Sequence, residues 1–236
     1  METATASALI YWEEHGKGEP LVLLHGNGED MSVFSEQTPV FAEKYRVITV
    51  DSRGHGRSVA CGVKLHIGDM ADDLVCVLDA AGVDKANILG FSDGGNVAMV
   101  FASRYPERVR SLILTGANAD PSGLKFRYYC PMLLRQRFLT LATIFSPKAC
   151  RKKEYLDLMV LEPELRKQDL LRITAPTLIT AGENDMITRL HTDYLHVSIQ
   201  GSQLKIFPGG HFTVREHPEK YNRAVMEFLE HAGQKI

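Results

Sequence analysis

The sequence predicts an α/β fold, in which helices cover a mostly parallel sheet. Short, continuously apolar runs, such as residues 21–24, alternate along the chain with stretches that have helical spacing. Strands that alternate with helices form parallel sheets, and such strands are apolar throughout because both of their faces are covered. Glycine-rich or polar loops follow the apolar runs, and open α/β sheets place their binding sites there. The length of 236 residues suits one large domain.

Composition and charge exclude several classes of protein. Hydrophobic residues make up 44% of the chain and the formal net charge is -2, so nothing favours nucleic acid or an anionic membrane as a partner. The start of the chain does not resemble a secretory signal, and no apolar run approaches the roughly 20 residues that span a bilayer. The basic cluster Arg151-Lys152-Lys153 is interpreted as a solvated face. We therefore expect a cytoplasmic protein without a membrane or nucleic-acid partner.

The spacing of the cysteines also favours a cytoplasmic protein. Their spacings show no Cys-x-x-Cys pair and suggest no metal site, so we expect buried free thiols in a reducing cytoplasm. The four residues are Cys61, Cys76, Cys130 and Cys150. His191 and His196 lie five apart on an expected helix, which does not match the i, i+4 spacing of a metal-binding pair. No metal and no cofactor is predicted.

The first 82 residues contain the first elements of the alternation. In order, we expect an edge strand at 9–14, a buried strand at 21–24, a helix at 32–44 interrupted at Pro39, a buried strand at 45–50 and a helix at 67–81 that ends at Gly82. Two loops follow the buried strands, His25-Gly26-Asn27-Gly28 and the polar run from Asp51 to Ser58.

Residues 90–94, Gly-Phe-Ser-Asp-Gly, join an expected strand at 86–91 to an expected helix at 93–105. The pattern Gly-x-Ser-x-Gly at such a junction is typical of a nucleophile elbow. The sharp turn strains the serine backbone, and glycines on either side leave room for the crossing strand and helix. The Ser92 hydroxyl is thereby lifted clear of the sheet, beside a helix N-terminus that favours negative charge. Taken alone, the pattern could equally be a plain strand–helix turn.

Residues 120–175 break the alternation at one place. They contain helical, aromatic and aliphatic stretches that prolines punctuate. The interruption favours a helical cap at residues 120–163, inserted into a core made of residues 1–119 and 164–236, with its apolar side over the serine. The alternative is that this segment simply adds to the core.

The alternation resumes at Pro176. On either side of the interruption we expect a strand at 111–117, a strand at 177–181, a helix at 189–198, a strand at 203–207 and a helix at 218–231. The strand at 177–181 leads into Gly182-Glu183-Asn184-Asp185, and the strand at 203–207 leads into Pro208-Gly209-Gly210-His211. Both loops lie at the strand ends where open α/β sheets place their sites.

Together, the loop motifs resemble those of the α/β-hydrolase family, and the resemblance covers nearly the whole chain. Five motifs stand in order at the ends of expected strands: His25-Gly26-Asn27-Gly28, the run from Asp51 to Ser58, Gly90-Phe91-Ser92-Asp93-Gly94, Gly182-Glu183-Asn184-Asp185 and Gly210-His211. Their order Ser, Asp, His is that of the family. The resemblance implies an α/β-hydrolase fold with seven or eight strands, helices on both faces and a small helical cap. The Ser-Asp-Gly-Gly elbow is similar to that of valacyclovir-hydrolase-like and carboxylesterase-like serine hydrolases.

The resemblance implies a role for each motif residue. Ser92 is the expected nucleophile, and serine needs a base within hydrogen-bond reach. His211 would take its proton and later return it to the leaving group, while Asp185 would hold the imidazole and stabilise its charged form. The backbone N–H groups of Asn27 and Asp93 would form the oxyanion hole.

Two of these assignments have competitors in the sequence. Asp120 at the end of an earlier strand and the nearby Glu183 could replace Asp185, although the Gly-x-x-Asp spacing favours Asp185. His211 is the one histidine, of nine, in the loop that directly follows the last expected strand.

The predicted function is a cofactor-free serine hydrolase that cleaves small carboxylic esters through an acyl-enzyme. Alternatives within enzymes are carbon–carbon bond hydrolysis, acyl transfer or peracid formation by the same triad. An alternative of another class is a ligand-binding or receptor protein with little turnover. The oligomeric state stays open.

Substrate contacts are predicted in two places. Phe126, Tyr129 and Leu133 of the cap are candidates for an apolar wall over the serine. The Asp93 side chain could recognise a cationic group of the substrate, because a carboxylate beside a developing oxyanion is unfavourable unless a positive charge offsets it. The simpler interpretation is that the helix N-terminus favours an acid there.

Overall fold

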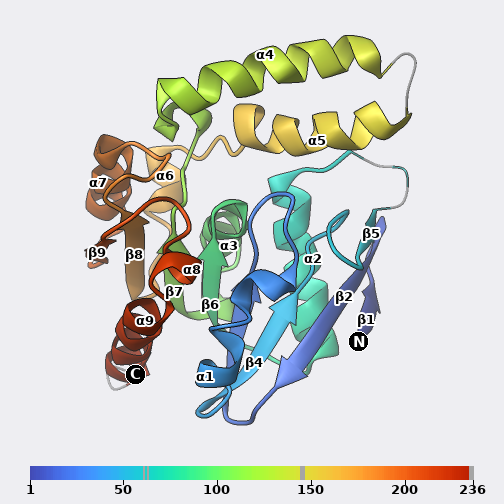
Figure 1. The fold of residues 1–236 in the computed structure, drawn as a ribbon. Helices are drawn as coiled ribbons and strands as arrows, with labels where there is room; N and C mark the ends of the chain where they lie inside the picture. The colour runs from blue at the N-terminus through green and yellow to red at the C-terminus, as the bar shows by residue number, and fades with distance from the viewer. Residues whose placement is uncertain (61, 63, 144–146, 234–236) are drawn as a thin grey trace.

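A computed structural model, which describes residues 1–60, 62, 64–143 and 147–233, confirms the α/β class. Nine described strands form one sheet in the order β1-β2-β4-β3-β6-β7-β8-β9, with β5 paired to β2 beside this path (Figure 1). The strands are β1 Glu2–Ala4, β2 Ala8–His15, β3 Glu19–Leu24, β4 Tyr45–Val50, β5 Val59–Ala60, β6 Ala86–Phe91, β7 Val109–Thr115, β8 Thr177–Gly182 and β9 Gln203–Phe207. The pairs that involve β2 are antiparallel, and all others are parallel.

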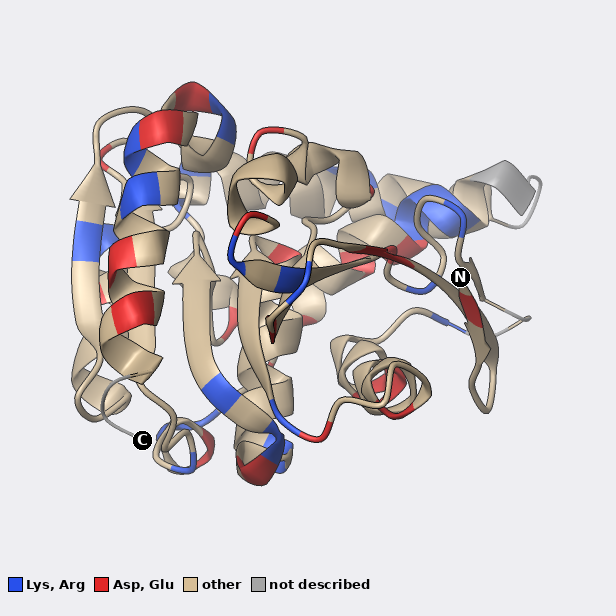
Figure 2. Cartoon of the chain, turned by 90° about the horizontal axis from the view of Figure 1, so that it is seen from below, with Lys and Arg blue, Asp and Glu red and all other residues tan. Residues whose placement is uncertain are grey.

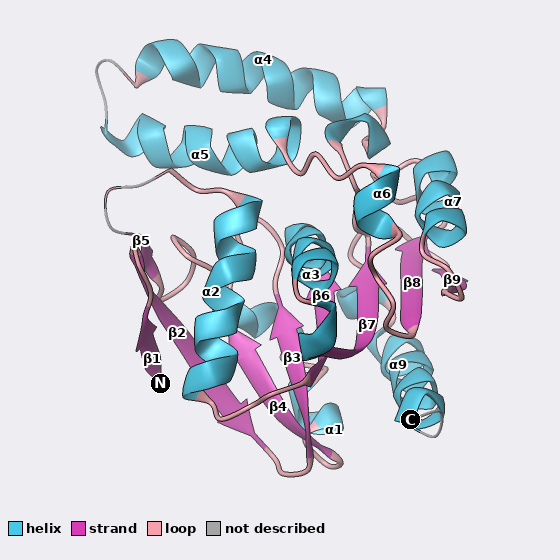
Figure 3. Cartoon of the chain, turned by 180° about the vertical axis from the view of Figure 1, so that it is seen from behind, coloured by secondary structure: helices cyan, strands magenta, loops and turns pink. Residues whose placement is uncertain are grey.

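Helices cover both faces of this sheet (Figure 3). The α-helices are α1 Thr38–Phe41, α2 Ile67–Ala80, α3 Asp93–Arg104, α4 Phe126–Ala142, α5 Pro147–Leu161, α6 Lys167–Leu170, α7 Arg189–Ser198, α8 Thr213–Glu216 and α9 Pro218–Gly233. Short 3-10 helices are η1 Met31–Phe34, η2 Pro106–Arg108 and η3 Pro121–Gly123. No helix in the described ranges is both long and apolar enough to span a membrane.

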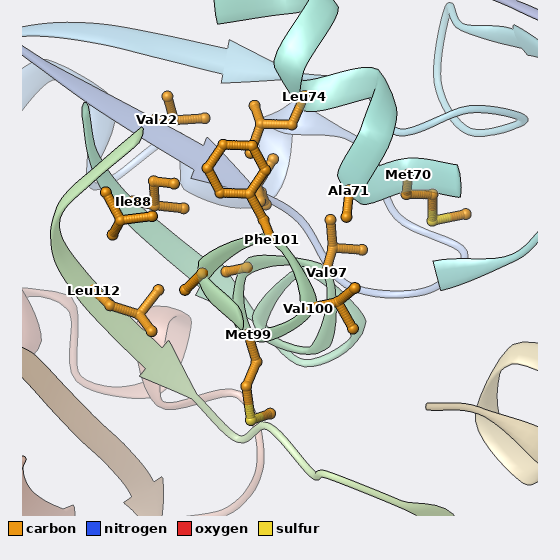
Figure 4. Packing of buried hydrophobic residues seen from close by; sticks show 14 of the residues in the cluster. Val22, Met70, Ala71, Leu74, Ile88, Val97, Met99, Val100, Phe101 and Leu112 are labelled. Carbon is orange, nitrogen blue, oxygen red and sulfur yellow. The ribbon is translucent and has the colours of Figure 1, made fainter. Parts of the chain in front are cut away.

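The parallel strands are apolar on both faces because each face has its own core. On β3, Val22 and Leu24 belong to the core that also contains residues of α2 and α3, whereas Leu21 and Leu23 belong to the core that contains residues of α1 and α9. In the first core, Phe101 of α3 packs among side chains of the sheet and of α2 (Figure 4). This two-sided burial fixes the strand register, because a shift by one residue would exchange the two faces.

The amino-terminal region differs from the prediction in two respects. The residues at 9–14 lie in β2, which is not an edge strand because β1 and β5 pair with it on the side away from β4. Strands of two or three residues show no periodicity, so the sequence pattern could not reveal β1 or β5. The helix expected at 32–44 is two short pieces, η1 and α1, with Pro39 in the first turn of α1. A proline suits that position because its missing N–H has no partner there.

Helices α4 and α5, which come between β7 and β8 in the chain, lie side by side beyond the carboxyl ends of the parallel strands (Figure 1). We call these two helices the cap helices. The Tyr155 hydroxyl of α5 donates to the Gly54 carbonyl at 2.8 Å, and the Asn27 amide donates to the Tyr155 carbonyl at 2.6 Å. These bonds tie α5 to the loops that follow β3 and β4.

The cysteines are less buried than the sequence suggests. Cys76 and Cys130 are half-buried and Cys150 is exposed, while Cys61 lies outside the described residues. No group of three or more His, Cys, Asp or Glu side chains within the described ranges could hold a metal ion.

Candidate active site

Ser92 stands at a strained turn between β6 and α3. Its backbone has φ 54° and ψ −123°, and it is the single non-glycine residue with positive φ in the described ranges. A Cβ atom at Gly90 would lie 2.2 Å from the Gly94 carbonyl oxygen, and one at Gly94 would lie 2.1 Å from the Leu24 carbonyl oxygen. Any larger side chain at either position would clash with backbone, so the two glycines allow this turn. Strain of this kind persists where the surrounding structure enforces it, often at functional sites.

Ser92, His211 and Asp185 form one chain of hydrogen bonds across three strand ends. His211 Nε2 lies 2.9 Å from Ser92 Oγ, and His211 Nδ1 lies 2.7 Å from Asp185 Oδ1. The side chains of His211 and Asp185 are 9% and 3% exposed, so the pair is shielded from water. A serine, a base and an orienting acid in this geometry can activate the hydroxyl as a nucleophile.

Asp185 is held in place by the backbone of its own loop. Its Oδ1 accepts from the Ile187 N–H at 3.0 Å, and its Oδ2 accepts from the Gly182 N–H at 3.3 Å. The rival carboxylate of Asp120 instead caps η3 by accepting from the Ser122 N–H at 2.8 Å. Of the two candidates, Asp185 is the one in contact with His211.

Asn27 and Asp93 lie in the segments that follow β3 and β6. In the part of the chain that the structure describes, neither backbone N–H donates a hydrogen bond to another residue. Both N–H groups are therefore available to a ligand at Ser92, which is what an oxyanion hole requires.

Two buried histidines brace the loop that contains Asn27. His25 Nε2 accepts from the Ser52 N–H at 3.0 Å, so its proton is on Nδ1, which donates to the Gly26 carbonyl at 2.7 Å. His55 stacks on Tyr155 with ring centroids 4.6 Å apart. Burial lowers the pKa of His25 and of His55 to about 4, so both rings are neutral near pH 7. Neutral rings fixed in this way hold the loop and are not placed to act as bases on Ser92.

The Asp93 side chain is buried and does not line the larger cavity that adjoins Ser92. It borders a small cavity of about 10 Å³ together with His55, and it is 9% exposed. Its Oδ1 accepts from the Asn96 amide at 3.1 Å, while its Oδ2 is buried without a partner in the described residues. Burial raises the pKa of Asp93 from 3.8 to about 6, although the nearby Asn27 side chain opposes this. The predicted contact between Asp93 and a substrate cation therefore has no support in this geometry.

The raised pKa of Asp93 gives a stability prediction. A carboxyl whose pKa is higher in the folded chain stabilises the fold fully below its unfolded pKa, and this contribution is lost as pH rises through the folded pKa. The pKa values of 3.8 and about 6 define the window. Between pH 4 and pH 7, Asp93→Asn should therefore gain up to about 3 kcal/mol in free energy of unfolding relative to wild type. Urea unfolding of both proteins across this range measures the gain. The prediction would be wrong if the free energies of unfolding of wild type and variant changed with pH in parallel.

A cavity of about 380 Å³ adjoins Ser92 and His211. Its apolar wall consists of Phe91, Tyr128, Met159, Met186 and Phe212, and its polar lining also includes Asn27, Glu29 and Asn184. A larger groove of about 700 Å³, bordered by α2, α3 and residues 161–165, contains none of the three hydrogen-bonded residues. The smaller cavity is therefore the candidate substrate site, because of these two it is the one that adjoins Ser92.

The cap helices contact this cavity through residues that differ from the predicted ones. Tyr128 of α4 and Met159 of α5 line it, whereas Phe126, Tyr129 and Leu133 do not. Phe126 is exposed, and Tyr129 and Leu133 are half-buried. The apolar residues of α4 are distributed around the whole helix, so its spacing could not tell which side turns toward the serine.

Glu29 is the functional candidate that sequence reasoning did not assign to the cavity. Burial raises the pKa of its carboxyl, and its Oε2 is buried without a hydrogen-bond partner among the described residues. Its Oε1 lies 3.6 Å from an Arg215 nitrogen, and the Arg215 side chain is half exposed. Its place two residues after Asn27 indicates from the sequence that it adds negative potential near Ser92, but does not reveal that it lines the cavity.

Comparisons with known proteins concern the fold and the sequence as a whole. A family model described as the alpha/beta hydrolase fold matches residues 19–137. The chain is 31% identical to a 2-hydroxy-6-oxononadienedioate/2-hydroxy-6-oxononatrienedioate hydrolase of Burkholderia vietnamiensis strain G4, over 93% of this chain and 90% of the relative.

Two solved structures resemble the fold closely. An enol-lactonase from Burkholderia xenovorans LB400 superposes with a TM-score of 0.83 at 19% identity, over 98% of this chain and 100% of the other. Est816, described as an N-acyl homoserine lactone degrading enzyme, gives a TM-score of 0.80 at 27% identity, over 97% of this chain and 100% of the other. The likeness to the enol-lactonase concerns the fold alone.

Proposed function

The chain belongs to the α/β hydrolase fold family, and from this premise we propose that it is a serine hydrolase that cleaves small carboxylic esters through an acyl-enzyme. The observation that carries the proposal is the position of His211, within hydrogen-bond distance of both Ser92 and Asp185. Family membership supports hydrolysis in general, while the choice of an ester bond rests on the cavity.

Each step of ester cleavage has a residue suited to it. Ser92 Oγ attacks the ester carbonyl while its proton moves to His211 Nε2, and Asp185 stabilises the resulting imidazolium. The N–H groups of Asn27 and Asp93 bind the tetrahedral oxyanion. His211 then gives the proton to the departing alcohol, which leaves an acyl group on Ser92. A water that loses its proton to His211 attacks this acyl group, and the bond to Ser92 Oγ breaks as His211 returns that proton to the serine oxygen, which releases the acid.

Carbon–carbon bond hydrolysis is the second candidate, because the relative at 31% identity is named for a dioate substrate of that chemistry. A dioate carries two negative charges, which a cavity must offset with positive groups. None of the described residues that line the cavity is a lysine or an arginine, and Glu29 adds a carboxyl. This lining favours neutral or cationic substrates, and hence simple esters over dioates.

Steady-state kinetics with two substrates tests whether the protein cleaves esters or carbon–carbon bonds. We expect kcat/KM for p-nitrophenyl acetate to exceed kcat/KM for 2-hydroxy-6-oxononadienedioate by at least tenfold. The reverse order would replace ester cleavage with carbon–carbon cleavage. Covalent labelling by a fluorophosphonate without turnover of either substrate would instead indicate a binding protein with a reactive serine.

The Glu29 carboxyl, which lines the cavity, gives a prediction about selectivity for the charge of the substrate. Between two charges about 8 Å apart, at an effective dielectric constant of about 20, repulsion costs about 2 kcal/mol. At pH 8, Glu29→Gln should therefore raise kcat/KM for mono-p-nitrophenyl succinate by about tenfold or more relative to p-nitrophenyl acetate. Glu43→Gln, at an exposed position outside the cavity, is the matched control and should leave the ratio unchanged. An unchanged ratio in Glu29→Gln would exclude Glu29 as a selectivity determinant.

A further inference from the structure

The outer side of α4 exposes large apolar side chains. Leu134, Phe138 and Leu141 are 64%, 70% and 67% exposed, and their spacing of four and three residues places them on one side of the helix. Helix α4 is the outermost layer, with α5 between it and the rest of the molecule (Figure 1; Figure 3). These three side chains therefore point to solvent, although burying each would be favourable.

The charged residues of α4 are all basic. They are Arg127, Arg135 and Arg137, and none of the three makes an ion pair in the part of the chain that the structure describes. All three are exposed. We call Leu134, Phe138, Leu141 and these three arginines the cap face.

The charge of the chain is divided unevenly. Residues 126–161 contain seven Lys or Arg and two Asp or Glu, a formal charge of +5, so the remaining residues carry -7. Over the core, residues of both signs are interspersed (Figure 2). The overall charge of -2, which gave no reason to expect an anionic membrane, conceals this division. The basic end of the molecule is also the end that exposes the apolar side chains.

We propose that the cap face docks on an anionic lipid membrane surface. Interfacial helices combine exposed Leu or Phe side chains, which enter the boundary between headgroups and acyl chains, with basic residues that attract anionic lipids. Arginine can also pair with lipid phosphate through two hydrogen bonds. A second copy of the chain is the poorer occupant, because symmetric packing of two α4 helices would bring arginines together. The same helix supplies Tyr128 to the cavity, so docking brings the wall of that cavity close to the membrane.

Vesicle co-sedimentation of the full chain tests this proposal. Wild type should sediment with vesicles of phosphatidylcholine and phosphatidylglycerol but not with phosphatidylcholine alone, and raising the salt from about 0.05 to about 0.5 M should release it. Basic residues near an anionic surface contribute about fivefold each to the binding constant. The triple variant Arg127→Gln, Arg135→Gln, Arg137→Gln should therefore bind about a hundredfold more weakly.

Two further variants test whether the apolar side chains of the cap face contribute to vesicle binding more than exposed apolar side chains elsewhere. Leu134→Ser, Phe138→Ser, Leu141→Ser should weaken binding by at least tenfold. The control Leu190→Ser, Val197→Ser removes side chains on α7 that are 83% and 78% exposed, and it should bind as wild type does. Circular dichroism should be unchanged in all variants, and turnover of a soluble ester should be unchanged in the Leu134→Ser, Phe138→Ser, Leu141→Ser variant and in the α7 control, because none of their residues lines the cavity.

Three results would overturn the proposal. One is a failure of folded wild type to bind the anionic vesicles. Another is equal loss of binding in the α7 control. The third is a wild-type dimer in light scattering that the Leu134→Ser, Phe138→Ser, Leu141→Ser variant converts to a monomer, because the cap face would then be covered by a second copy. Each result is independent of ester turnover, so the proposed activity stands or falls separately.

Discussion

Ser92→Ala should lower kcat for p-nitrophenyl acetate by about 10⁴- to 10⁶-fold while the protein remains folded. The hydroxyl that His211 contacts is the group that would attack the ester, and alanine offers no substitute. The substitution removes one oxygen at the elbow and keeps a Cβ, so packing around the turn is preserved. Ester turnover measured at high enzyme concentration gives the loss in kcat. A urea unfolding curve of the variant checks that it is folded.

Ser103 provides the matched control for the nucleophile. It lies on α3, near the opposite end from Ser92, and is buried. Ser103→Ala should keep activity within about threefold of wild type, since most substitutions away from the reacting groups act on stability instead. Retention of more than a tenth of the wild-type rate by Ser92→Ala would remove Ser92 as the nucleophile.

Asp185→Asn should lower kcat by about 10⁴-fold. An amide can donate to His211 Nδ1 and thereby favour the tautomer whose Nε2 carries the proton, which cannot accept one from Ser92. The amide also lacks the charge that stabilises the imidazolium. The pH–rate profile and kcat of this variant, measured beside wild type, test both effects.

Asp120→Asn is the control for the orienting acid. Asp120 lies in the loop after β7 and caps η3, and no contact with His211 is found in the described residues. Its replacement should leave both stability and kcat near those of wild type, because the asparagine oxygen can still accept from the Ser122 N–H. If Asp120→Asn lost more activity than Asp185→Asn, the assignment of the orienting acid would be reversed.

The elbow could be predicted from sequence because its requirements are local. The clash distances at Gly90 and Gly94 follow from three crossing backbone segments, and the pattern Gly-x-Ser-x-Gly is the simplest solution. The predictions for Asp185 and His211 rest on a similar rule, because parallel strands bring their carboxyl ends to one edge of the sheet. The structure brings both residues to hydrogen-bond distance along this edge.

The cavity wall could not be predicted because it depends on long-range placement. The spacing of Phe126, Tyr129 and Leu133 is compatible with several orientations of α4, and the observed one turns Tyr128 inward. The orientation of the Asp93 carboxyl depends on the packing beside Asn96 and His55, which no local pattern reports. The charge division between the cap helices and the core is visible in the sequence, but its meaning depends on which side of α4 is exposed.

Mass spectrometry after reaction with a fluorophosphonate tests the central claim most directly, namely that Ser92 is the activated nucleophile. Trypsin should release residues 86–104 as one peptide, which contains Ser92 and Ser103. We predict one adduct per chain, placed on Ser92 by fragmentation, and no adduct in Asp185→Asn under the same brief exposure. An adduct on another residue, or full ester turnover by a protein that takes no label, would contradict the proposed mechanism.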